Sequence, residues 1–118
     1  MPRRAARVDD NQAKLVKIMR QLGASVEITS SAHQGFPDCV VGFGGVTVLV
    51  EIKDGDKVPS KRQLTPDQVV FHERFKGAIT VIETEQQAIE LVNQMRRVAG
   101  MIGGVDWNMG AVASGENG

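Results

Sequence analysis

The chain has 118 residues, 42% hydrophobic and 24% charged, and this composition predicts a single globular domain. Its 14 Lys and Arg balance its 14 Asp and Glu, which excludes a wholly basic surface and limits any nucleic-acid site to a local basic patch. The single cysteine excludes an intramolecular disulfide, while the charged N-terminal segment and short apolar runs predict a soluble, cytoplasmic protein that does not enter a membrane.

The N-terminal part of the sequence predicts a basic arm followed by a helix. Residues 1–8 carry three arginines, and we expect them to form a loose arm ahead of a domain over residues 9–99. Apolar residues at helical spacing predict a helix over about residues 10–22, which Gly23 ends. Gln12 belongs to the inward-facing stripe of this helix.

Three strands are predicted next, and they suggest an antiparallel meander. Residues 25–30 alternate between polar and apolar, and a polar loop over 31–37 follows. Residues 38–43 are apolar and rich in β-branched side chains. Gly44-Gly45 is a hairpin signal, and it leads into the strongest predicted strand, residues 46–53.

The rest of the chain predicts a helix, a strand, a helix and a tail. After a polar, basic loop over 54–64, Thr65-Pro66 begins a helix that runs to about residue 76. A fourth strand over 78–83 precedes the last helix, and the glycine-rich residues 100–118 are expected to be flexible. The order α-β-β-β-α-β-α predicts an α/β fold with a mixed four-stranded sheet flanked by helices.

A charged pair stands at the end of the strongest strand. Strand alternation places Glu51 and Lys53 on one face, opposite a wholly apolar face. Taken alone, the pair is typical of a solvated strand end with an ion pair worth about 0–1 kcal/mol.

Asp38 favours a second interpretation, because the hairpin places it opposite the neighbourhood of Glu51. Two converging carboxylates repel each other and raise a pKa, and a hard cation such as Mg²⁺ relieves this, with the Ile52 carbonyl as a further ligand. Phosphodiester cleavage uses such a centre, and Lys53 can either orient the attacking water or offset charge at the phosphate. The simpler interpretation of Asp38 is a turn residue after proline.

Several other residues admit two interpretations each. Gln68 occupies the glutamine position of a capping box, yet it also lies where a side chain can reach the end of the sheet. A histidine in the loop before the second strand, His33, is a candidate phosphate contact or an ordinary surface residue. The loop after the strongest strand carries basic residues that would contact DNA phosphates or simply maintain solubility: Lys57, Lys61 and Arg62.

Three segments together resemble the PD-(D/E)xK nuclease superfamily: Gly-Phe-Pro-Asp ending at Asp38, Glu-Ile-Lys over 51–53, and Leu-Thr-Pro-Asp-Gln ending at Gln68. In detail the chain resembles the VRR-NUC branch, the virus-type replication-repair nucleases, and its phage-encoded stand-alone members. The resemblance runs from about residue 9 to the last helix. It implies a restriction-endonuclease-like core with Mg²⁺ or Mn²⁺ held by Asp38, Glu51 and the Ile52 carbonyl. The catalytic set that it implies is Asp38, Glu51, Lys53 and Gln68.

The stand-alone relatives act as homodimers and resemble Holliday-junction resolvases. Many relatives have a metal-assisting glutamate in the first helix, where this chain has Gln12 and Lys14. We therefore expect a structure-specific DNA endonuclease of a phage or prophage that cuts branched DNA in the bacterial cytoplasm, with Gln12 as its first-helix contributor. The alternative is a non-catalytic module of the same fold that binds branched DNA or a replication partner. A restriction-type enzyme would need a sequence-reading domain, for which the chain has no room.

Overall fold

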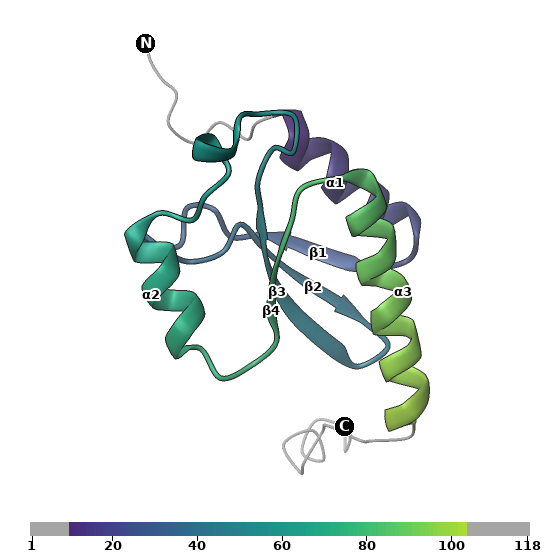
Figure 1. The fold of residues 1–118 in the computed structure, drawn as a ribbon. Helices are drawn as coiled ribbons and strands as arrows, with labels where there is room; N and C mark the ends of the chain where they lie inside the picture. The colour runs from purple at the N-terminus through teal and green to yellow at the C-terminus, as the bar shows by residue number, and fades with distance from the viewer. Residues whose placement is uncertain (1–9, 104–118) are drawn as a thin grey trace.

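The computed structural model describes residues 10–103 (Figure 1), so the expected N-terminal arm and most of the expected tail lie outside the described residues. The described elements follow the predicted order, with one added turn of 3₁₀ helix. In sequence they are α1 (Asp10–Gln21), β1 (Ser25–Ile28), β2 (Cys39–Phe43), β3 (Val46–Ile52), η1 (Pro59–Lys61), α2 (Pro66–Arg74), β4 (Ile79–Ile82) and α3 (Glu85–Ile102).

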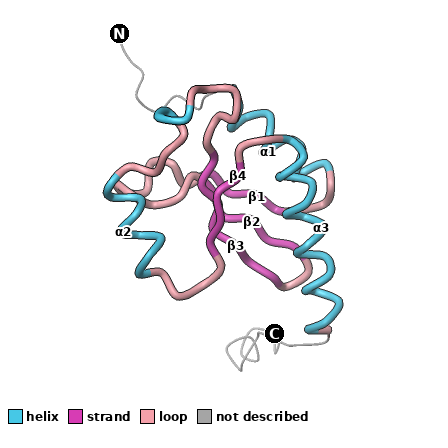
Figure 2. Tube along the Cα trace, viewed as in Figure 1, coloured by secondary structure: helices cyan, strands magenta, loops and turns pink. Residues whose placement is uncertain are grey.

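The four strands form one mixed sheet in the order β1-β2-β3-β4 (Figure 2). Strands β1 and β2 are antiparallel, and so are β2 and β3, which confirms the predicted meander. Strand β4 is parallel to β3. A parallel neighbour requires the chain to cross over the sheet, and α2 lies in that crossover.

A two-residue turn joins β2 to β3 and sets their register. Gly44 and Gly45 have φ angles of 59° and 88°, the left-handed region that a tight hairpin turn requires at both positions. Phe43 therefore pairs with Val46, and Cys39 pairs with Val50. One step further along the two strands, Asp38 faces Glu51, and directly opposed side chains lie on the same face of a sheet.

The two faces of the sheet differ in their cover (Figure 1). Helices α1 and α3 pack against each other and against one face, where the main hydrophobic core lies. That core takes alternate residues of β3, and it includes Cys39 of β2. Helix α2 lies on the other side of the sheet, where it buries Phe71. The side chains of Asp38 and Glu51 point to this second side, away from the main core.

Some element ends differ from the sequence prediction. Strand β1 ends at Ile28 instead of residue 30, because Thr29 turns the chain and its Oγ1 donates to the Pro37 carbonyl at 2.9 Å. Helix α2 ends at Arg74, since Phe75 has extended backbone angles. Helix α3 continues through Gly100 to Ile102, so its last three residues lie in the segment that we expected to be a flexible tail. Of the helices within residues 10–103, none has the length and apolar character needed to span a bilayer.

Candidate functional site

The carboxylate of Asp38 is held by the backbone of the neighbouring strand. Its Oδ2 accepts a hydrogen bond of 2.8 Å from the Ile52 N–H. Asp38 comes just before β2 and Ile52 ends β3, so this bond fixes the side chain where the two strands meet. Ile52 itself is buried in the main core, which leaves its backbone as the part that faces the site.

Glu51 is almost completely buried, with 2% of its surface exposed. The interpretation of a solvated strand end is therefore wrong. One oxygen, Oε2, accepts a hydrogen bond of 3.0 Å from Gln68 Nε2 and lies 3.7 Å from Lys53 Nζ. The other oxygen, Oε1, is buried and has no donor among the described residues. A buried acceptor without a donor is rare in folded proteins and marks a place where a proton or a cation is missing.

The electrostatics of the site follow from this burial. The pKa of Glu51 is raised from 4.5 to about 8, first by burial, then by the negative charge of Asp38 and by a hydrogen bond between the two carboxyl groups, against an opposing effect of Lys53. A hydrogen bond between two carboxyl groups needs one shared proton, because two carboxylates are both acceptors. At neutral pH the pair therefore favours either that proton or a bound cation.

Gln68 fills both of the roles that the sequence left open. Thr65 Oγ1 accepts from the Gln68 N–H at 3.3 Å while Gln68 Oε1 accepts from the Thr65 N–H at 2.9 Å, which is a capping box. The same Oε1 accepts from Lys53 Nζ at 2.9 Å, and the amide nitrogen donates to Glu51. The side chain of Gln68 thus caps the N-terminus of α2 and forms hydrogen bonds with both Lys53 and Glu51.

Lys53 reaches the site from just beyond the end of β3. Its side chain is 14% exposed, and its ammonium contacts Gln68 and Glu51 on the α2 side of the sheet. Its own N–H donates to the Ile82 carbonyl at 3.0 Å, which continues the pairing of β3 with β4. This hydrogen bond fixes the backbone of Lys53, from which its side chain extends to the site.

The loop before Asp38 packs against the start of α2. Gly35 has a φ of +88°, and a Cβ there would lie 2.8 Å from the Asp67 carbonyl oxygen, so only glycine fits. Nearby, the rings of His33 and Phe36 lie 5.3 Å apart, and Phe36 lies 5.2 Å from Phe71 of α2. His33 is exposed, and its edge contact with Phe36 places it at the rim of this loop.

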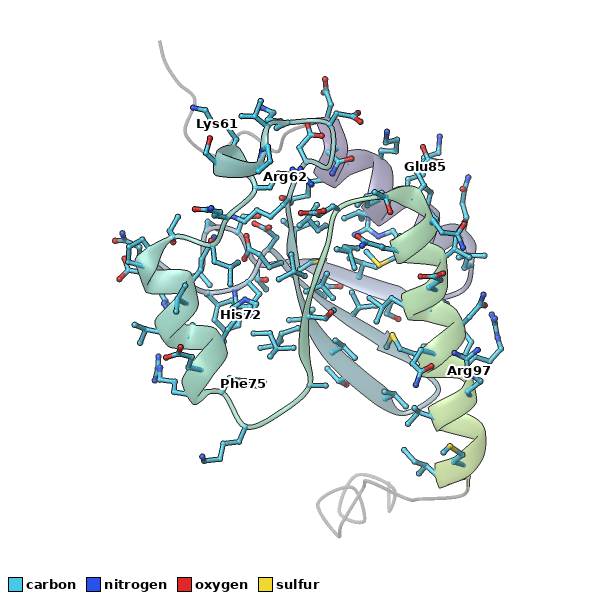
Figure 3. All side chains as sticks on the ribbon, in the orientation of Figure 1. Lys61, Arg62, His72, Phe75, Glu85 and Arg97 are labelled. Atoms are coloured by element: carbon cyan, nitrogen blue, oxygen red, sulfur yellow. The ribbon has the colours of Figure 1, made fainter. Side chains whose placement is uncertain are left out.

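His72 lies four residues after Gln68, and this spacing places both on the same side of α2. Figure 3 shows His72 between α2 and the sheet. Its Nε2 is buried and has no hydrogen-bond partner among the described residues. Burial, followed by the charge of Lys53, lowers the pKa of His72 below 6.5, so the ring is mostly neutral at pH 7. No motif in the sequence distinguishes His72 from an ordinary helix residue.

The first helix contributes two consecutive amides to this end of the sheet. Gln12 is 5% exposed, as its place on the inward stripe predicts, and its Nε2 donates to Ser30 Oγ at 3.2 Å. Ser30 Oγ in turn donates to the Asp38 carbonyl at 3.5 Å. Asn11, which the sequence analysis missed, donates to the Lys53 carbonyl at 2.6 Å. No local pattern identifies Asn11, because its partner lies 42 residues away.

The basic residues of the loop between β3 and α2 are not equivalent. Lys57 and Lys61 are exposed, whereas Arg62 is half-buried and forms an ion pair with Glu83 at 3.4 Å. Figure 3 shows Lys61 and Arg62 at the end of the molecule where this loop runs, beyond the end of β3. The loop that follows β3 thus offers two exposed ammonium groups and one guanidinium that is engaged in an ion pair within the protein.

The donor set fits a hard divalent cation that keeps most of its waters. Asp38 and Glu51 supply two carboxylates, one with an unpaired buried oxygen, and Mg²⁺ is commonly held by one or two carboxylates plus water. Within residues 10–103 no group of three His, Cys, Asp or Glu side chains is arranged to hold a metal. The fit is therefore to a sparse site that backbone oxygen and water must complete, and a closed cage of side chains is not formed.

The arrangement joins two carboxylates, a lysine and a glutamine at one end of a mixed sheet, on the side of the sheet where α2 lies. Such a group can hold a cation next to an ammonium, which suits chemistry on an anionic oxygen ester. Two hollows of about 590 and 660 Å³ lie against α3 and at the β2–β3 turn, and none of these four side chains lines either of them. The chain gives no significant match to any protein-family model, curated protein or solved structure.

Proposed function

We propose that the protein is a divalent-metal-dependent DNA endonuclease of the VRR-NUC type, built on a restriction-endonuclease-like core. The observation that carries this proposal is the state of Glu51. A carboxylate that is 2% exposed, faces Asp38 and has one oxygen without a donor in the part of the chain that the structure describes is costly to maintain. A bound Mg²⁺ or Mn²⁺ removes that cost, and perturbed carboxylates of this kind occur mainly at functional sites.

Each side chain then has a defined task. Asp38 and Glu51 would hold the metal, and the Ile52 carbonyl would be a third protein ligand. The bound metal supplies Lewis-acid polarisation of the phosphate and a more acidic water. Lys53 places its positive charge at the reacting phosphate, and Gln68 keeps that ammonium beside Glu51 through its two hydrogen bonds. Lys57 and Lys61, with His33 at the rim of the Asp38 loop, contact the phosphates of the flanking DNA.

The substrate that we propose is branched DNA, and the acting species is a homodimer. A single chain offers one site, whereas symmetric cutting of a junction needs two, and C₂ symmetry is the commonest way to supply them. Light scattering at micromolar concentration then gives twice the chain mass of 12.8 kDa. We place the activity in the cytoplasm of a bacterial host, as a function of a phage or prophage.

Cleavage assays with single-stranded, duplex, flap and four-way substrates, each in Mg²⁺, Mn²⁺ and EDTA, test this proposal. We expect cutting only with metal, and we expect Lys53→Ala to abolish it while metal binding and the fold persist. Lys17→Ala, which removes an exposed lysine of α1, is the matched control and keeps activity. Cleavage by Lys53→Ala at the rate of the unmodified protein would refute the assigned role.

A second candidate function is a binding module that holds branched DNA or a replication partner without cutting. The observation that favours it is the sparse donor set, in which the first helix presents the amide of Gln12 and no third carboxylate joins Asp38 and Glu51 within the described residues. Such a module binds four-way DNA equally in EDTA and in Mg²⁺ and leaves every strand intact. The nuclease cuts in Mg²⁺, so one gel separates the two functions.

A further inference from the structure

Asn11 binds two strand ends with one amide group. Its Nδ2 donates to the Lys53 carbonyl at 2.6 Å and to the Glu83 carbonyl at 3.2 Å. An amide nitrogen has two hydrogens, so it can serve both carbonyls at once. These carbonyls follow the last paired residues of the parallel strands β3 and β4, which end at Ile52 and Ile82. The first turn of α1 therefore links the ends of β3 and β4 at the end of the sheet where the site lies.

The Lys53 backbone is consequently held on both of its polar groups. The N–H donates to Ile82, and the carbonyl accepts from Asn11. Beyond this point the chain leaves the sheet and enters the polar loop over 54–64, which is exposed over most of its length. The hydrogen bond from Asn11 therefore holds the Lys53 backbone at the point where the chain leaves the sheet and enters the loop.

The two backbone carbonyls that meet Asn11 require a hydrogen-bond donor at this position. The carbonyls of Lys53 and Glu83 both carry partial negative charge and both approach the same nitrogen. An aspartate here would have the shape of asparagine but only acceptors, and it would repel both carbonyls. An alanine would leave two carbonyls without this donor.

We propose that Asn11 is a positioning residue for Lys53, fixing its backbone so that the ammonium meets Gln68 and Glu51. This role rests on the proposed nuclease function, in which Lys53 acts at the phosphate. Catalytic groups act within narrow distances, and a displacement of about 1 Å can cost about a hundredfold in rate. The effect of removing Asn11 is therefore expected in kcat, with little change in DNA affinity or metal affinity.

The test compares three variants at Asn11 with one control on the same helix. Asn11→Ala and Asn11→Asp are expected to lower kcat at least tenfold, with KM for DNA and Mn²⁺ affinity within twofold of the unmodified protein. Asn11→Gln keeps the donor and is expected to retain more activity than Asn11→Asp, although aspartate is closer in shape. Arg20→Ala is the control, because Arg20 also donates from α1 to a backbone carbonyl at 2.6 Å, that of Val26 in β1, away from the site.

A second readout does not depend on activity. The ammonium of Lys53 donates a hydrogen bond to Gln68, so its hydrogens should exchange slowly with water in the unmodified protein and in Arg20→Ala. The same exchange, followed through the ¹⁵N signal of the ammonium, should become fast in Asn11→Ala. Equal losses of kcat in Asn11→Ala and Arg20→Ala, or an unchanged ammonium signal in Asn11→Ala, would overturn the positioning role. Absence of cleavage by the unmodified protein with any metal would overturn the nuclease function alone, and the ammonium signal would then decide the role of Asn11.

Discussion

Replacing Glu51 by Gln is expected to stabilise the protein above about pH 5, because glutamine keeps the shape and loses the charge. The pKa of Glu51 is about 8 in the folded protein against 4.5 for an ordinary glutamate, with burial as the largest cause. Between these two values the folded protein holds a proton that the unfolded chain has released. The free energy of unfolding therefore falls as the pH rises through this window.

The magnitude follows from the same two values. A tenfold change in proton affinity corresponds to ~1.4 kcal/mol, so ionising Glu51 in the folded protein costs on the order of 5 kcal/mol. This is a large share of the ~5–15 kcal/mol by which small domains are stable. Glu51→Gln should match the unmodified protein near pH 4 and exceed it increasingly from pH 5 to pH 9. Gln68 can still donate to the new amide oxygen, so the helix contact persists.

Urea unfolding followed by circular dichroism, in EDTA and at a series of pH values, measures this difference directly. Glu27→Gln, at an exposed position of β1, controls for the loss of one surface carboxylate. In Mg²⁺ at about a hundred times its Kd, the unmodified protein gains about 2.7 kcal/mol, and Glu51→Gln gains less because a ligand is lost. Parallel pH curves for Glu51→Gln and the unmodified protein would refute the claim that Glu51 is held at a cost.

Three further outcomes can be checked. Gly35→Ala should lower the free energy of unfolding by about 1–3 kcal/mol in the same urea assay, because φ is +88° and the new Cβ would meet Asp67 at 2.8 Å. Cys39 should react with a thiol reagent only after unfolding, since burial raises its pKa to about 12 and leaves it 0% exposed; prompt labelling of the native protein would contradict this. Replacing Lys57 and Lys61 together by Ala should flatten the log–log salt dependence of DNA binding by about two, and an unchanged slope would remove the loop from the interface.

The parts of the fold that sequence predicts well are those fixed by short-range geometry. Gly44-Gly45 sets the hairpin, and alternation along β3 then decides which face each side chain joins. These two facts bring Asp38 to Glu51 without further information. The end of α3 could not be predicted in this way, because glycine at position 100 normally weakens a helix. That helix is packed against the hairpin, as the closeness of Ala99 to Gly44 shows, and tertiary contact overrides the local preference.

The same distinction between short-range geometry and tertiary contact applies to the residues of the candidate site. Residues between Asp38 and Gln68 form motifs that can be recognised in sequence, and the two interpretations of Gln68 were both correct since one side chain satisfies both. The burial of Glu51 was not predictable, because it depends on how α2 covers the end of β3. Asn11 has partners 42 and 72 residues away, and only a folded structure brings them together.

The bond from Asn11 to Glu83 also has a consequence for the order of folding. The hairpin that brings Asp38 to Glu51 closes a short loop, and short loops close early and at low entropic cost. The bond to Glu83 spans 72 residues, so it can form only after β4 has joined the sheet. During synthesis from the N-terminus, the first turn of α1 can therefore form this hydrogen bond only after residue 83 has been made and has left the ribosome. From these loop lengths we expect the carboxylate pair to assemble first, and Lys53 to reach its final position only when most of the domain is complete.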